Sequence, residues 1–178
     1  MAQQYFVLGI GGTGMRCIES LIHLCAMGMF DDSDIHLLAL DTDKDNGNFA
    51  RLKEVKEAYV KAKGTDASLR TALNETFFSA NINYYEFSPN YEVKSDFMSV
   101  FNYGDTKFNN PEQTAIADLV LTKNVETFNL RHGYRAQTHL GSMMMYHSIL
   151  EAARSNKNSE LKTYLQKLIQ VAQNGGAR

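Results

Sequence analysis

The hydrophobic positions near the N-terminus predict two strands joined by one helix. Residues 5–8 form an unbroken apolar run that leads directly into a glycine cluster, and residues 35–40 form a second run. Unbroken runs of this length are typical of strands that are buried on both faces of a parallel sheet. Between the runs, apolar residues recur at the spacing of one helix face: Cys17, Ile18, Leu21, Ile22 and Cys25. Residues 1–43 are therefore predicted to form a right-handed βαβ unit.

Beyond this unit the pattern predicts mostly helices. Gly64-Thr65-Asp66 is expected to interrupt the first of them, and Asn174-Gly175-Gly176 is expected to end the last. Residues 79–111 contain both prolines and have poor periodicity, so we expect an irregular segment with some extended or short helical pieces. The ranges expected to be helical are 49–63, 69–78, 112–128, 138–154 and 161–171. This order predicts an α/β chain with a Rossmann-like three-layer fold and a mostly parallel sheet.

Length and composition are those of a single globular domain. The chain has 178 residues, of which 44% are hydrophobic and 21% are charged, and we expect residues 1–178 to form one domain. The net charge of −2 argues against a broad nucleic-acid surface or a polybasic membrane patch. The N-terminus has no features of a secretion signal, and the longest apolar stretch, Ile18–Phe30, is too short to span a bilayer. We therefore expect a cytoplasmic protein with no nucleic-acid or membrane partner.

The cysteines and histidines predict neither a disulfide nor a metal site. Cys17 and Cys25 fall on one predicted helix and cannot pair without breaking it, so we expect both to be reduced, buried and structural. His139 and His147 lie too far apart on a helix to chelate one metal ion, and no Cys-x-x-Cys or His-x-x-x-His is present. No metal site made by protein ligands alone is expected.

The glycine cluster after the first strand has the chemistry of a phosphate site. Backbone N–H groups at the start of a helix are free to donate, and the helix dipole adds partial positive charge there. Gly9, Gly11 and Gly14 match G-x-G-x-x-G, and Gly12 adds a position without a side chain that would hold a phosphate away. Thr13 adds a hydroxyl group. The alternative is a tight strand–helix turn that binds no ligand.

Asp41-Thr42-Asp43 follows the second strand, where dinucleotide-binding folds place an acidic residue on the ribose. The triplet could equally contact a base, bind a metal-bound phosphate or cap the next turn. These alternatives stay open from the residues alone.

Residues 5–46 resemble the N-terminal segment of the tubulin and FtsZ superfamily. In FtsZ-type proteins a strand runs into a V-G-G-A-G-like loop, and a second strand ends in an N-T-D-like triplet. The counterparts here are residues 10–14 (Ile-Gly-Gly-Thr-Gly) and 41–43 (Asp-Thr-Asp). The L-D-T-D form at residues 40–43 is most similar to bacterial tubulin-like proteins of uncertain function. Residues 133–141 resemble the superfamily's third nucleotide-binding loop and the helix that follows it.

The resemblance implies a site for GTP or GDP, with Mg²⁺ arriving on the nucleotide. By analogy Arg135 and Thr138 face the phosphates, and an arginine suits forked hydrogen bonds to phosphate oxygens. The alternative is that Arg135 is a solvated loop residue and Thr138 a helix cap. Arg16 stands where FtsZ-type loops usually carry asparagine, which leaves the preference for guanine open. The implied partners are the nucleotide and, in a filament-forming or regulatory GTPase, further copies or other protein subunits.

Two superfamily features are absent from this sequence. The signature G-G-G-T-G-[ST]-G loop does not occur, and neither does the C-terminal activation domain. We therefore expect the chain to be the first part of a longer nucleotide-binding protein. GTPase activity, if present, would belong to the longer protein, and these 178 residues alone are expected to bind nucleotide weakly and hydrolyse none.

Three other functions compete with this interpretation. The glycine pattern with Asp41 also suits an NAD(P)-dependent oxidoreductase, although no catalytic Tyr-x-x-x-Lys is present. Asp41, Asp43, Asn48 and Arg51 loosely resemble the pattern of ATP-dependent adenylating enzymes of the ubiquitin-activating class. The last alternative is a Rossmann-like protein–protein module without a ligand.

Overall fold

A computed structural model describes residues 3–43, 46–69, 77–89, 111–120, 138–154 and 159–175. The chain divides into two compact units. The first combines Met1–Asp41, Asn46–Phe87 and Ala152–Arg178, and the second combines Thr42–Asp45 with Ser88–Glu151. None of the helices within the described ranges is long and apolar enough to cross a lipid bilayer.

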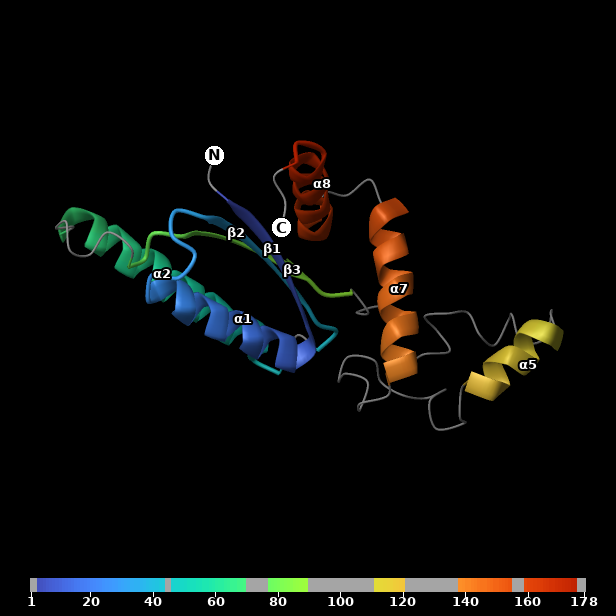
Figure 1. The fold of residues 1–178 in the computed structure, drawn as a ribbon. Helices are drawn as coiled ribbons and strands as arrows, with labels where there is room; N and C mark the ends of the chain where they lie inside the picture. Colours follow the sequence, from blue (N-terminus) through green and yellow to red (C-terminus); the bar gives the residue numbers. More distant parts are fainter. Residues whose placement is uncertain are drawn as a thin grey trace. The chain divides into compact units, whose positions relative to one another are not determined.

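The first unit contains a parallel sheet of three strands (Figure 1). They are β1 (Gln4–Ile10), β2 (Asp34–Leu40) and β3 (Asn81–Phe87), paired in the order β1-β2-β3. The register aligns the strand ends, so Gln4, Asp34 and Asn81 share one edge, while Ile10, Leu40 and Phe87 share the other. The predicted parallel βαβ unit is therefore confirmed, and β2 lies between two neighbours, as its unbroken apolar sequence requires.

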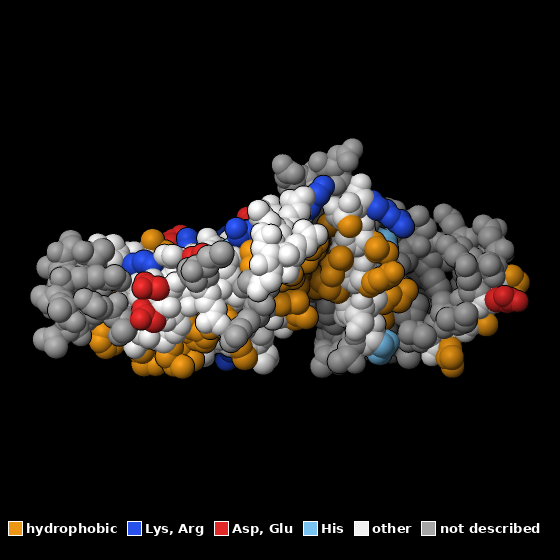
Figure 2. Space-filling model, turned by 45° about the horizontal axis from the view of Figure 1, so that its top comes forward, with side chains coloured by type: hydrophobic (Ala, Val, Ile, Leu, Met, Phe, Trp, Pro, Cys, Tyr) orange, Lys and Arg blue, Asp and Glu red, His pale blue; other side chains and the backbone are white. Residues whose placement is uncertain are grey.

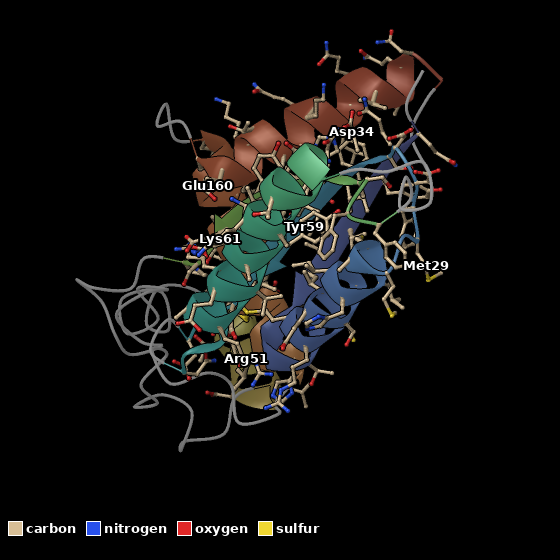
Figure 3. The ribbon with its side chains drawn as sticks, turned by 90° about the vertical axis from the view of Figure 1, so that its left-hand side faces the viewer. Met29, Asp34, Arg51, Tyr59, Lys61 and Glu160 are labelled. Carbon is tan, nitrogen blue, oxygen red and sulfur yellow. The ribbon has the colours of Figure 1, made fainter. Side chains whose placement is uncertain are left out.

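Helices α1 (Gly11–Ala26) and α2 (Asn48–Leu69) lie side by side on one face of the sheet (Figure 3). The Arg51 guanidinium on α2 binds Glu19 on α1 through both carboxylate oxygens, at 2.7–3.1 Å. These hydrogen bonds hold the pKa of Glu19 below its usual value. Beneath them lies the main core, which includes Met15, Ile18, Ile22, Cys25, Ile35, Leu37, Ala39, Phe49, Leu52 and Tyr59.

Helix α8 (Glu160–Gln173) covers the other face, which completes a Rossmann-like α/β fold of three layers. The Ser159 hydroxyl accepts a hydrogen bond from the Lys162 amide at 3.2 Å and caps the helix. Tyr164 is 4% exposed and makes edge-to-face contacts with Phe6 and Tyr85, both with ring centroids 5.6 Å apart. This second core is smaller and more polar than the first.

His36, from the middle of β2, lies within this polar layer. Its ring stacks on Phe6, with centroids 4.5 Å apart and planes inclined by 10°, and lies nearly parallel to Tyr85 at 6.3 Å. The side chain is buried, and neither ring nitrogen has a hydrogen-bond partner among the described residues. Burial lowers the pKa of His36, Asp34 opposes the shift, and Lys167 adds to it. The imidazole is therefore neutral near pH 7.

Side chains of α2 hold the first residues of β3. The Tyr59 hydroxyl donates to the Ala80 carbonyl at 2.8 Å. The Lys63 ammonium donates to the carbonyls of Ser79 and Ala80 at 2.7 and 2.9 Å, and to Oδ1 of Asn81 at 2.6 Å. These bonds anchor the start of β3 to the second half of α2.

The second unit includes α5 (Pro111–Val120) and most of α7 (Thr138–Arg154). On α7, Leu140, Met144 and Ser148 are buried at the four-residue spacing of one helix face, while Met143 and Tyr146 are exposed. Figure 2 shows further hydrophobic side chains on the surface of this helix. The bounds of α7 are those predicted.

The structure differs from the sequence predictions at three places. Helix α2 continues through Gly64 to Leu69, and the Thr65 hydroxyl bonds to the Lys61 carbonyl at 3.1 Å within the helix. The segment expected to be irregular from residue 79 begins with strand β3. Cys17 is exposed, because it lies beside the buried stripe of α1 rather than on it, whereas Cys25 is buried as expected. The expected helices at 69–78 and 112–128 extend outside the described residues.

We expect iodoacetamide to alkylate Cys17 readily and Cys25 hardly at all in the folded protein. Cys17 is exposed, whereas burial raises the pKa of the Cys25 thiol to about 11 and removes its reactive thiolate. Peptide mass spectrometry after a short pulse at pH 8 measures the two rates, and urea-unfolded protein is the control. Comparable labelling of both residues in the folded state would contradict the packing of α1.

Lowering the pH from 7 to 5 is expected to destabilise the wild-type protein more than a His36→Gln variant. The folded-state pKa of His36 lies below its usual value of 6.5, so the unfolded chain takes up a proton first as the pH falls below that value. The neutral histidine's contribution to stability is present above pH 6.5 and lost below it. Urea unfolding of both proteins at the two pH values tests this, and equal losses would contradict it.

Candidate functional site

The passage from β1 to α1 is immediate. Strand β1 ends at Ile10, whose backbone is extended, and α1 begins at Gly11. Gly11 has φ of 67°, a conformation that side-chain-bearing residues rarely adopt. The predicted loop is therefore the first turn of the helix itself, and residues 11–14 (Gly-Gly-Thr-Gly) form it.

Gly9 and Gly14 bring the strand and the helix into backbone contact. A Cβ on Gly14 would lie 2.7 Å from the carbonyl carbon of Gly9, and a Cβ on Gly9 would lie 2.8 Å from the Gly14 oxygen and 2.6 Å from Cδ1 of Ile18. No side chain fits at such distances without displacing α1 from β1. These two glycines have a packing role, which matches the close helix–strand packing assigned to the third glycine of dinucleotide-binding loops.

The first turn of α1 has the properties of an anion site. The first four N–H groups of a helix have no partner within the helix, and they concentrate its positive partial charge. No side chain caps this turn and it contains no acidic residue. Gly11, Gly12 and Gly14 are half-buried and Thr13 is exposed, so an anion can approach the amides from solvent. The arrangement can bind a phosphate or carboxylate through backbone donors.

The Asn48 side chain lies next to this turn and is linked through Asn46 to Asp41. The Asn48 amide lies 2.8 Å from the position that a Cβ on Gly12 would take, so the start of α2 reaches the glycine turn. The Asn48 backbone N–H donates to Oδ1 of Asn46 at 3.0 Å, and Nδ2 of Asn46 donates to Asp41 at 3.2 Å. Asp41 itself is buried at the end of β2, where its N–H donates to the Phe87 carbonyl at 3.2 Å. Asp41 and the glycine turn therefore share the carboxyl edge of the sheet.

The other five candidate residues are Arg16, Thr42, Asp43, Arg135 and Thr138. Arg16 is exposed on α1, two residues after Gly14. Thr42 and Asp43 belong to the second unit, where Thr42 is buried and Asp43 is half-buried. Arg135 lies outside the described residues, and Thr138 begins α7 with a side chain that is likewise outside them. The structure thus assembles Gly11, Gly12, Thr13, Gly14 and Asp41.

Asn46, which bonds to Asp41, was not among the predicted site residues. Its signal in the sequence is weak, because an Asn two residues before a helix is usual for turn and cap chemistry. Within the described ranges, no group of three or more His, Cys, Asp or Glu residues is placed to hold a metal ion. Comparison of the chain with known protein families, curated proteins and solved structures finds no match.

A Gly14→Ala variant is expected to destabilise the protein by about 1–3 kcal/mol, the usual cost of overpacking. Helix propensity alone would favour alanine by up to about 1 kcal/mol, so a net loss of stability would come from overpacking against Gly9. Gly64→Ala is the matched control, because that helical glycine faces open space and the change is expected to stabilise α2 by about 0.5–1 kcal/mol. Urea unfolding measures both. If the two variants behave alike, the tight strand–helix contact is refuted.

Proposed function

We propose that this chain binds a nucleotide, GTP or GDP with Mg²⁺ first among them, as a tubulin-like module. The observation that carries the proposal is the uncapped, glycine-rich first turn of α1 at the carboxyl edge of a parallel sheet. Ligands of open α/β sheets bind at this edge, and phosphates bind at helix N-termini there.

The choice of a tubulin-like module draws on the resemblance of residues 10–14 and 41–43 to the superfamily's first two nucleotide-binding segments. In this proposal Gly11–Gly14 hold the phosphates, while Asp41, Thr42 and Asp43 contact the sugar, the base or the metal-bound phosphate. The resemblance assigns Arg135 and Thr138 to the phosphates, and it aligns Arg16 with a position where FtsZ-type loops usually carry asparagine. A longer protein would use the module in a filament or as a regulatory GTPase.

Binding of NAD(P) is the second candidate. The close packing of Gly14 on Gly9 is the role of the third glycine in dinucleotide-binding loops, and Asp41 follows β2, where those folds bind the ribose. The adenylating alternative has less support, because Arg51, the arginine of its pattern, is held by Glu19.

A Thr13→Asp variant is expected to lose nucleotide binding while keeping or gaining stability. Thr13 is exposed at the third position of α1, where an acidic side chain stabilises a helix by about 0.3–1 kcal/mol but repels phosphate. Affinity should fall at least about tenfold, since a like charge within hydrogen-bonding distance costs more than about 1.4 kcal/mol. Thr13→Asn is the control, because asparagine has nearly the same shape as aspartate but carries no charge.

Glycine-labelled ¹⁵N NMR suits a weak site, because the chain has 12 glycines and three of them lie in the first turn of α1. Millimolar GTP with Mg²⁺, ATP with Mg²⁺ and NADH are titrated separately. Saturable shifts of Gly11, Gly12 and Gly14 that are strongest with GTP support the proposal. Shifts seen only with NADH would favour NAD(P) binding over the tubulin-like proposal. No shifts with any of the three nucleotides would overturn both candidate functions.

A further inference from the structure

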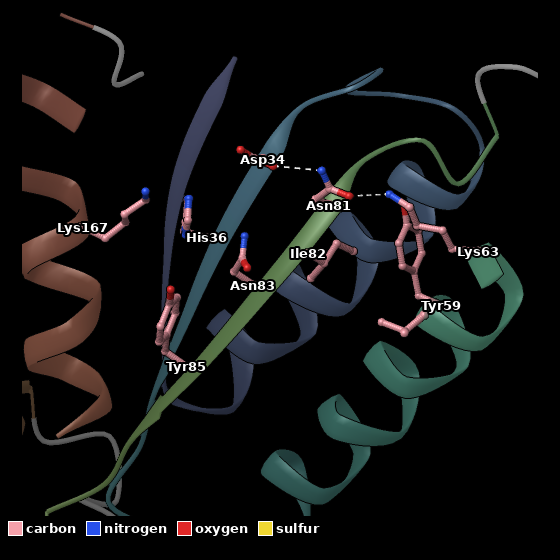
Figure 4. Close-up of a pocket in the computed structure, with 10 residues that line it drawn as sticks. Asp34, His36, Tyr59, Lys63, Asn81, Ile82, Asn83, Tyr85 and Lys167 are labelled. Atoms are coloured by element: carbon pink, nitrogen blue, oxygen red, sulfur yellow. Dashed lines mark hydrogen bonds between the residues drawn. The ribbon is translucent and has the colours of Figure 1, made fainter. Parts of the chain in front are cut away.

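The opposite edge of the sheet contains a pocket of about 610 Å³ (Figure 4). Its lining includes Asp34 and Asn81, the first residues of β2 and β3, so it lies at the amino edge, away from the glycine turn. A pocket of this volume falls within the range typical of small-molecule sites. All of its lining residues belong to the first unit.

His36 is a buried polar residue in the wall of this pocket. The side chain is only 4% exposed, and both ring nitrogens lack a hydrogen-bond partner within the described part of the chain. The stacking on Phe6 and Tyr85 fixes the plane of the ring, so its nitrogens can only meet partners at the ring edge. Buried polar groups in folded proteins are nearly always hydrogen-bonded, so this pair of nitrogen atoms in a pocket wall requires a partner such as water, an ion or a ligand.

A free cation lies beside this histidine. Figure 4 shows Lys167 extending from α8 toward His36, with Asn83 and Tyr85 projecting from β3 on the same side. Lys167 forms no ion pair with any described residue, whereas Lys63, at the other end of the pocket, is already held by three oxygen atoms. Lys167, rather than Lys63, is therefore available for a ligand.

Hydrogen bonds join the lining residues Lys63, Asn81 and Asp34 to one another. Asn81 Nδ2 donates to Asp34 at 3.0 Å, and Lys63 donates to Asn81 Oδ1 at 2.6 Å. These bonds hold the Asp34 carboxylate in the pocket wall, two residues before His36 on β2. The wall therefore offers two donors, the Lys167 ammonium and the imidazole N–H, and a carboxylate acceptor near them.

We propose that this pocket is a second binding site, specific for a small organic molecule with a carboxylate or phosphate group. The oxyanion accepts hydrogen bonds from the Lys167 ammonium and the N–H of His36, and the Asn83 amide lies close enough in register to add a third. Donor groups elsewhere on the molecule would meet Asp34. The site is independent of nucleotide binding at the glycine turn.

The test follows the imidazole resonances of His36 by NMR, identified with the His36→Gln variant, while sodium phosphate or sodium acetate is added at constant ionic strength. The two salts separate phosphate from carboxylate preference. We expect a saturable shift at His36 with at least one of them, and any shift of Gly11, Gly12 and Gly14 should follow a separate binding curve with its own midpoint. Lys167→Met should weaken binding about 10–100-fold, the usual effect of losing a charge-assisted hydrogen bond.

Lys162→Met is the matched control, because it removes the same charge from the same helix outside the pocket. Its affinity should stay within about twofold of the wild type, since surface charges act weakly at moderate salt. An absence of saturable shifts at His36 with both salts would overturn the proposal. Equal weakening by the two lysine variants would also overturn it, because it would show non-specific attraction to α8.

Discussion

The backbone contact between Gly9 and Gly14 is the constraint on which the first unit depends. It allows α1 to start directly at the end of β1 and to bring Ile18 against the strand. The same contact fixes where the free amides of the first helical turn point. Packing and the proposed ligand chemistry are therefore coupled here, because a side chain at either glycine would shift the core and the proposed anion site together.

Parallel pairing gives the two edges of the sheet different chemistry. At the carboxyl edge, the donors are backbone amides of α1, and the surrounding residues are mostly glycine and asparagine. At the amino edge, side chains supply the donors and acceptors. Asp34 and Asn81 are the first residues of their strands, and His36 lies two residues after Asp34 on the same face of β2. The first edge suits an anion held by the backbone, and the second suits a ligand recognised by side chains.

The elements with strong periodicity were predictable from the sequence. The βαβ unit and the bounds of α7 follow from continuous or helically spaced apolar residues, and the glycine turn follows from its position between them. Strand β3 was expected only as an unplaced extended piece within residues 79–111, because Asn81 and Asn83 put polar side chains on a strand of a parallel sheet, where unbroken apolar runs are expected. Gly64 did not end α2, because packing against the sheet and the bonds of Tyr59 and Lys63 outweigh one residue's low propensity.

The two candidate sites also differ in how far the sequence alone predicts them. The glycine turn is contiguous in sequence, so its residue types alone predict an anion site there. The amino-edge pocket draws on β2, β3, α2 and α8, and the polar residues that line it have no common spacing in the sequence. The parallel register and the position of α8 bring His36 and Lys167 together. The residues next to each of them in the sequence give no signal that the two side chains lie close in space.

The bonds from Tyr59 and Lys63 to the start of β3 have a consequence for chain length. They set the register of β3 through groups on α2, so the register does not depend on how many residues join the two elements. Closing a longer connection would cost little, since each doubling of a flexible loop adds only about 0.6 kcal/mol. The junction between α2 and β3 is therefore a place where evolution or an engineer can insert sequence while the sheet keeps its alignment.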